Sequence, residues 1–160
     1  MIDAERSDKL LRFFESMLAF YQDFLTFERE KYNIIVSGEL GKLDEALKRE
    51  QAFTLKARGL EIDRKKVLEE AGAAQYTFRE LIPQVEPSRR EPLEKLYGGI
   101  SATVADVRQV NERCSRMTRL KMGRVSQILS KIEDHPELKQ IYKSNLQNPA
   151  DAEGSFSRKV

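Results

Sequence analysis

The sequence predicts an all-α fold: an elongated antiparallel helical bundle or coiled-coil hairpin of three long helices, one short helix and a flexible C-terminal tail. Two observations support this fold class. Apolar residues recur at three- and four-residue steps over three long stretches of the 160-residue chain, a spacing that places them on one side of a helix. Charged residues make up 34% of the chain, Trp is absent, and Gly and Pro are few, which is typical of long solvated helices.

The first helix is predicted from residue 7 to about residue 36. Its apolar residues form two neighbouring stripes, the second of which repeats every seven residues. The first stripe contains Leu11, Phe14, Leu18, Tyr21, Leu25, Tyr32 and Ile35. The second stripe contains Phe13, Phe20, Phe27 and Ile34. Together they cover roughly half of the helix circumference, so we expect two helices to pack against this one.

The second helix is predicted from about residue 42 to residue 71, where Gly72 favours a helix end. Its line of apolar residues is thin, and Glu50 and Arg64 interrupt it. A short helix follows, because Thr77 and Glu80 have the spacing of a capping box. It can last only about two turns before Pro83, whose ring breaks a helix.

The last helix is predicted to begin between residues 88 and 93 and to reach about residue 132. Pro87 and Pro92 lie near its start, where a missing amide donor costs little, and Gly98-Gly99 is a candidate bend. At 1.5 Å per residue this helix is about 60 Å long, against about 45 Å for each of the first two. Its C-terminal end would therefore leave four apolar residues with little cover: Val125, Ile128, Leu129 and Ile132.

We divide the chain into a helical domain, residues 1–135, and a C-terminal segment, residues 136–160. The segment starts with a short amphipathic piece that contains Leu138, Ile141 and Tyr142. The residues after it are polar and show no periodicity, so we expect the end of the chain to be a disordered tail.

Residues that could carry chemistry are scarce. Cys114 and His135 are the only residues of their kinds, and on one continuous helix they would lie about 30 Å apart. A Cys-His mechanism needs the two side chains in contact, and a lone imidazole is a poor transition-metal site. We therefore predict no enzymatic activity, no metal and no cofactor, and we interpret Cys114 as a small buried thiol.

Charge and cysteine content indicate the compartment. The net charge of +2 gives no overall field that would hold a nucleic acid or an anionic membrane. The first ten residues, MIDAERSDKL, are charged where a secretion signal would be apolar, and a single cysteine cannot form an intramolecular disulfide. We expect a cytoplasmic protein. No stretch has the ~18 apolar residues that a membrane span needs, so we expect no membrane insertion.

A basic run in the last helix requires separate interpretation. Six basic residues stand against the single acid Glu112: Arg108, Arg113, Arg116, Arg119, Lys121 and Arg124. Most of them lie opposite the apolar stripe, as on the solvated back of an amphipathic helix. An acidic protein partner or a nucleic acid are the alternatives, and the absence of interleaved aromatic residues disfavours the nucleic acid.

Polar residues also occupy positions that should face the core. They are Glu50, Arg64, Thr103, Asn111 and Thr118. An unpaired polar group in such a position costs about 1–3 kcal/mol. Two interpretations stay open: a loosely packed coiled coil with hydrated polar positions, or a cleft that accepts the helix of a partner.

The sequence resembles the FlgN-type flagellar export chaperones over roughly residues 8 to 133. The resemblance lies in the helix end at Ser37-Gly38 and in four segments: LDEALKREQAFTLKARGLEIDRKKVLEEAG, TFRELI, VNERC and RVSQILSKI. The last helix of this family commonly carries two Asn residues three positions apart. Asn111 matches the first position, and Cys114 departs from the pattern at the second.

The resemblance implies a helical, non-enzymatic export chaperone. Such a protein would bind the amphipathic terminal helix of flagellar hook-associated proteins in the cytoplasm, prevent their premature assembly and deliver them to the export gate. The resemblance also implies client binding through the C-terminal part and contact of a C-terminal Tyr with the export gate, for which Tyr142 is the candidate. The candidate client-binding residues are Val125, Ile128, Leu129, Ile132, Leu138 and Ile141.

The alternative function is a structural coiled-coil protein without a secretion client. It would self-associate through the aromatic stripe of the first helix, which contains Phe20. The sequence leaves open which client is bound and whether the free protein is a monomer or a homodimer.

Overall fold

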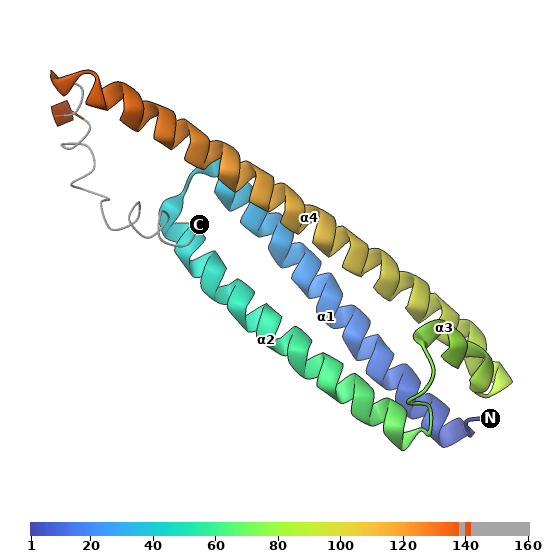
Figure 1. The fold of residues 1–160 in the computed structure, drawn as a ribbon. Coiled ribbons are helices and arrows are strands. Elements are labelled where there is room, and N and C mark those ends of the chain that lie inside the picture. Colours follow the sequence, from blue (N-terminus) through green and yellow to red (C-terminus); the bar gives the residue numbers. More distant parts are fainter. Residues whose placement is uncertain (138–139, 142–160) are drawn as a thin grey trace. The chain divides into compact units, whose positions relative to one another are not determined.

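The computed structural model describes residues 1–137 and 140–141 and confirms the all-α class (Figure 1). The helices with defined bounds within these residues are three long ones and one short one, as the sequence predicts. In chain order the elements are α1 (Ala4–Ser37), α2 (Leu40–Glu70), α3 (Phe78–Leu81), the 3₁₀ turn η1 (Ile82–Gln84) and α4 (Pro87–Glu133). Within the described residues, no helix is both long enough and apolar enough to cross a bilayer.

The chain divides into two compact units, and each long helix contributes to both. Unit 1 consists of Met1–Phe27 and Gln51–Arg108, and unit 2 consists of Glu28–Glu50 and the chain from Gln109 onward. This division separates the chain across its helices rather than near residue 135. The predicted boundary at residues 135 and 136 stays a prediction, and the predicted tail lies outside the described residues.

Unit 1 contains an apolar core between the first half of α1, the second half of α2 and the beginning of α4. Its most deeply buried large residues are Leu10, Phe14, Leu81 and Leu93. α1 and α2 run antiparallel here, since Lys9 pairs with Glu70 at 2.9 Å and Phe24 stacks on Phe53 with ring centroids 5.0 Å apart. The predicted wide apolar face of the first helix therefore packs against two neighbours.

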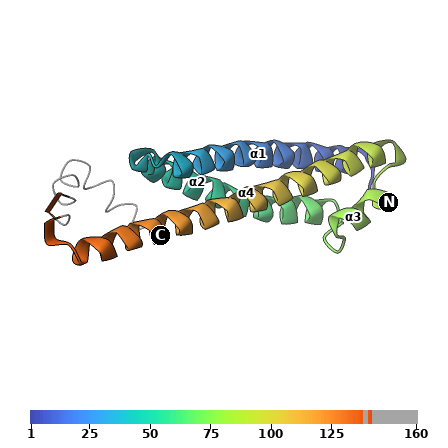
Figure 2. The same ribbon diagram turned by 90° about the horizontal axis from the view of Figure 1, so that it is seen from above.

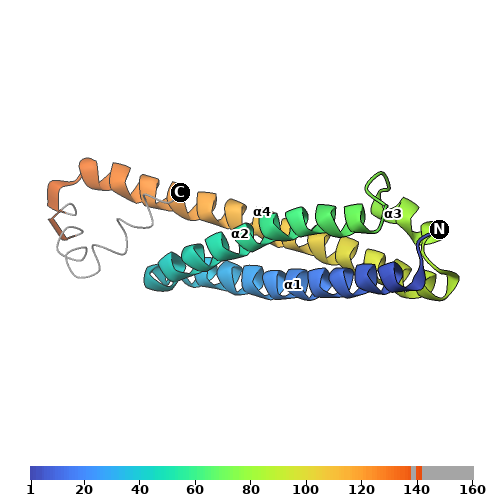
Figure 3. The same cartoon turned by 90° about the horizontal axis from the view of Figure 1, so that it is seen from below.

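The segment between α2 and α4 packs beside the N-terminus of the chain (Figures 2 and 3). The Ile2 amide donates to the Gln84 carbonyl at 2.7 Å. The predicted capping box is present, because the Thr77 hydroxyl accepts from the Glu80 amide and the Glu80 carboxylate accepts from the Thr77 amide. Gly72, with φ at +70°, ends α2 in the left-handed conformation that favours glycine.

The start of α4 differs from the prediction. The helix begins at Pro87, one residue before the predicted range, so Pro92 lies inside it and not at its first turn. Contacts with α1 hold this early turn, since Asp8 forms a two-pronged ion pair with Arg89 at 3.0 and 3.2 Å. This ion pair compensates for the loss of the backbone hydrogen bond that Pro92 cannot donate.

Gly98-Gly99 does not interrupt α4, which continues through it to Glu133. A side chain at Gly99 would place its Cβ 3.3 Å from the Leu18 side chain, whereas the space beside Gly98 is open. Gly99 therefore allows close packing of α4 on α1, and the bend at this pair stays a prediction.

Candidate functional site

Unit 2 contains a smaller core, formed by the end of α1, the beginning of α2 and α4 from Gln109. Ile35, Leu43 and Cys114 are buried at its centre. Partly buried residues surround them: Tyr32, Ile34, Leu40, Leu47, Val110, Met117 and Met122. Cys, Met and Tyr make up a larger share of this core than of the core of unit 1. Sulfur-containing side chains are polarisable and adapt to irregular packing.

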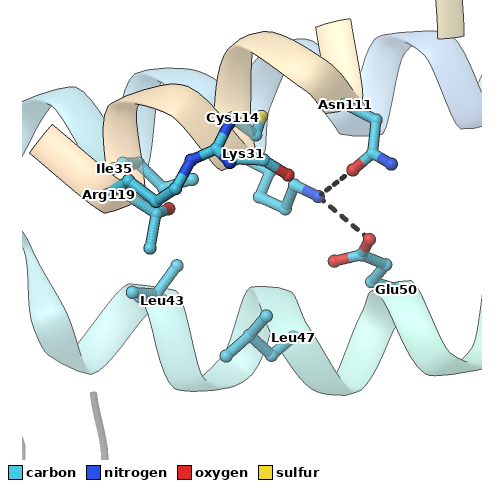
Figure 4. Close-up of a pocket in the computed structure, with 10 residues that line it drawn as sticks. Lys31, Ile35, Leu43, Leu47, Glu50, Asn111, Cys114 and Arg119 are labelled. Carbon is cyan, nitrogen blue, oxygen red and sulfur yellow. Dashed lines mark hydrogen bonds and ion pairs between the residues drawn. The ribbon is translucent and has the colours of Figure 1, made fainter. Parts of the chain in front are cut away.

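A buried charge network crosses this core. The Lys31 ammonium lies 3.0 Å from Glu28. It also lies 2.9 Å from Glu50 and donates to the Asn111 side chain at 3.3 Å (Figure 4). The side chains of Lys31 and Glu28 are only 5% and 1% exposed. One ammonium from α1 thus joins carboxylates of α1 and α2 to an amide of α4.

Glu28 and Glu50 both lie beside the Lys31 ammonium, and burial and charge shift the pKa values of Glu28 and Lys31. Burial raises the pKa of Glu28, and the charge of Lys31 reverses only part of this effect. Burial alone would lower the pKa of Lys31, but the hydrogen bond and charge of Glu50, with the charge of Glu28, raise it overall. Lys31 therefore stays charged, while Glu28 is the group whose charge the core disfavours.

Cys114 lies beside this network and is 2% exposed. Burial raises the pKa of its thiol to about 11, and its Sγ lies 3.8 Å from the Glu28 carbonyl oxygen. A thiol with such a pKa is protonated and unreactive at neutral pH, as expected for a structural residue.

A pocket of about 350 Å³ opens between α2 and α4 next to the network. Figure 4 shows Leu43, Leu47 and Glu50 on the α2 side and Asn111, Cys114 and Arg119 across from them. The lining residues are Lys31, Ile35, Leu43, Leu47, Glu50, Asn111, Cys114, Ser115, Thr118 and Arg119. The pocket thus combines apolar side chains with a few polar and charged groups, as ligand sites commonly do.

A second pocket, of about 120 Å³, adjoins the first and shares Ile35 and Leu43 with it. Its other lining residues are Ile34, Gly38, Glu39, Leu40, Lys121 and Val125. Val125 is one of the candidate client-binding residues. The structure therefore connects that candidate face to a cavity that the sequence did not reveal.

The remaining candidate residues have unequal exposure. Ile128 and Leu129 are 46% and 45% exposed on α4, and Ile141 is 59% exposed. Ile132 is buried at 7%, contrary to the prediction of little cover. Directly after α4, the His135 amide donates to the Ile132 carbonyl. Leu138 and Tyr142 lie outside the described residues.

Of the five predicted polar core positions, Thr103 is buried, Glu50, Arg64 and Thr118 are partly buried, and Asn111 is exposed, contrary to the prediction. Glu50 and Asn111 join the network, Thr118 lines the larger pocket, and Thr103 donates to the Gly99 carbonyl at 2.7 Å. Arg64 contributes to neither the network nor the larger pocket. It forms an ion pair with Glu61 on the same helix and is about one-third exposed, because its long side chain can reach past the seam to solvent.

Sequence reasoning missed Glu28 and Lys31, although a signal was present. Lys31 lies four residues after Phe27 and four residues before Ile35, so it occupies the helix position between two buried apolar residues. The predicted stripe passed over this gap because only apolar residues were assigned to it.

The basic run largely has the predicted solvated character. Arg108, Arg116, Arg119 and Arg124 are exposed. Arg113 lies over the Tyr32 ring at 4.6 Å, and Lys121 donates to the Val36 carbonyl at 2.7 Å. The part of the chain that the structure describes holds no group of three or more potential metal ligands.

Comparison with protein-family models gives a match to the model described as FlgN protein over residues 1–150. Neither the curated proteins nor the solved structures contain a match to the chain.

Proposed function

The chain belongs to the FlgN family of flagellar export chaperones, and we propose that it binds the amphipathic terminal helix of flagellar hook-associated proteins in the cytoplasm. Binding would cover the apolar face of the client before secretion and so prevent premature assembly. The chaperone would then deliver the client to the export gate, with Tyr142 as the proposed contact residue.

One observation carries the proposal beyond the family: α4 exposes large apolar side chains at its C-terminal end. Ile128 and Leu129 are each nearly half exposed, and Val125 lines the small pocket on the same helix. Apolar residues at three- and four-residue steps are how one amphipathic helix binds another. Ile141, which is also exposed, and Leu138 would extend this surface.

The energy of such an interface suits a reversible carrier. Full burial of a Leu or Ile side chain stabilises a complex by about 1.5–3 kcal/mol. Side chains of both helices must be buried before their sum exceeds the cost of association, so a small interface of this kind binds with moderate affinity. A client held in this way can be released when the export machinery competes for it.

The first test is the variant Ile128→Asp/Leu129→Asp. It places two charges on the proposed interface, so we expect affinity for a C-terminal fragment of a hook-associated protein to fall at least tenfold. Isothermal titration calorimetry with the full chain measures this change, and circular dichroism checks that helicity is unchanged.

Leu55→Asp/Ile62→Asp is the matched control, because these α2 side chains are 66% and 57% exposed and lie in unit 1. It should bind as the wild type does. Equal affinity of the α4 variant and the wild type would refute the proposed surface.

The structure gives no support to self-association through the aromatic stripe. Phe20 and Phe27 are 5% and 1% exposed, and the Phe27 ring stacks on Phe53 of α2 within unit 1. These rings are already buried inside the chain, so they are not available to a second copy.

A further inference from the structure

The larger pocket and the exposed end of α4 lie on the same side of that helix. Six α4 residues follow one another at alternating four- and three-residue steps: Asn111, Ser115, Thr118, Met122, Val125 and Leu129. This is the spacing of a coiled-coil seam. Asn111, Ser115 and Leu129 are exposed, whereas Thr118, Met122 and Val125 are partly buried, so the core of unit 2 covers part of this line and leaves the rest to a partner helix. The first half of the line is polar and borders the larger pocket, and the second half is apolar and contains two candidate client-binding residues.

The charge at the mouth of the pocket is positive. Lys31 is already satisfied by Glu28, Glu50 and Asn111. Arg119 is exposed at the edge of the pocket, and no acidic group of the described residues forms an ion pair with it. Glu112 is the only acid between residues 107 and 132. A segment that enters the pocket therefore meets an uncompensated guanidinium, which prefers a carboxylate.

We infer that the client helix continues along this seam into the larger pocket, inserts a large apolar side chain between Leu43, Leu47 and Cys114, and places an Asp or Glu against Arg119. The inference rests on the proposed function and names the class of client: an amphipathic helix with an acidic residue beside one of its apolar anchors. The pocket volume of about 350 Å³ is at the lower end of ligand sites and is more than enough for one large side chain.

The geometry also fixes the spacing of the client anchors. Thr118 at the pocket and Leu129 at the exposed end are eleven residues apart, or about 16 Å along the helix axis. A client helix that packs alongside must carry apolar residues at about the same separation, which is three helical turns.

Two variants of the full chain test this inference by calorimetry with the same C-terminal fragment. Ser115→Trp fills the pocket from an exposed lining position, and Arg119→Glu reverses the charge at its mouth. Each should lower the affinity about tenfold. Arg124→Glu is the matched control: it makes the same charge change on the same helix, about 140° around the axis from Arg119, and should bind as the wild type does.

A client fragment with its acidic residues changed to Asn or Gln gives the complementary test. The changed fragment should bind the wild-type chain more weakly than the original fragment does, and its affinity should depend less on salt. Arg119→Glu should not lower the affinity for the changed fragment any further, because the charge pair is already absent.

The outcomes separate the inference from the proposed function. If Ser115→Trp and Arg119→Glu bind like wild type while Ile128→Asp/Leu129→Asp does not, the inference is overturned and the proposed function stands. If the wild type does not bind the fragment, both fail. Light scattering on the free proteins gives their oligomeric state. If the wild type is a dimer and Ser115→Trp is a monomer, a second copy of the chain occupies the larger pocket and the inference is overturned.

Discussion

Lys31 holds three side chains from three helices in place within unit 2. Its ammonium contacts Glu28, Glu50 and Asn111 at 2.9–3.3 Å, in a setting where the Lys31 and Glu28 side chains are almost fully buried. Such a network favours one alignment of the helices, because any shift leaves a charge without its partner. We interpret it as the device that sets the register of α1, α2 and α4 beside the pocket.

Lys31→Met should be strongly destabilising. It leaves the buried Glu28 carboxylate without the cation that lies 3.0 Å from it, and breaking a buried pair in this way costs about 3–5 kcal/mol. Urea unfolding measures the change in the free energy of unfolding. Adding Glu28→Gln to Lys31→Met should recover part of the loss, because the buried charge that lost its partner is then removed.

The loss should also depend on pH. A carboxyl whose pKa is raised by folding binds its proton more tightly in the folded state, so stability increases as pH falls towards its ordinary value of 4.5. Without Lys31 this effect is larger. The difference in unfolding free energy between wild type and Lys31→Met should therefore shrink between pH 7 and pH 5, and a constant difference would contradict this account of the network.

Two glycines of α4 show that packing against a neighbouring helix, and not helix propensity alone, determines which residue a helix position requires. Gly98 and Gly99 are adjacent in the sequence, and both are poor helix formers. Only Gly99 approaches another helix, with a hypothetical Cβ 3.3 Å from Leu18. The sequence could predict that this pair was unusual, but not which of the two glycines the neighbouring helix required.

Gly98→Ala should stabilise the protein by about 0.5–1 kcal/mol, since alanine favours the helix and its methyl group meets nothing within 4 Å. Gly99→Ala should gain less, because the Leu18 side chain must move to make room. Gly72→Ala should lose stability, because φ at +70° strains an alanine. Thermal unfolding of the three variants gives this order; equal gains at Gly98 and Gly99 would contradict the close packing.

Helix positions were the most predictable part of the molecule. The predicted range of α1 lies within three residues of the observed Ala4–Ser37, because its apolar stripes are long and regular. The start of α4 was less predictable, since the Asp8–Arg89 ion pair that holds it joins residues distant in sequence. The exposure of Ile132 was predicted wrongly, because helical periodicity alone does not show which side chains tertiary contacts cover.

At the scale of the whole molecule, the family and the all-α class follow from the sequence, whereas the composition of the candidate site does not. Glu50 and Asn111 were recognisable as polar residues in a core position. Lys31, which joins them, was not, because its place in the α1 stripe becomes evident only when the three helices are assembled. The pockets beside them likewise require side chains from different helices.

The central claim is that α4 binds the client through the side that carries Leu129. The most direct measurement is photocrosslinking, with a benzophenone side chain at position 129 and, as a control, at the exposed position Ile62 of α2. Our account predicts that the terminal fragment of a hook-associated protein crosslinks from position 129 and not from position 62. Efficient crosslinking from position 62, with none from position 129 while the client still co-purifies, would contradict it.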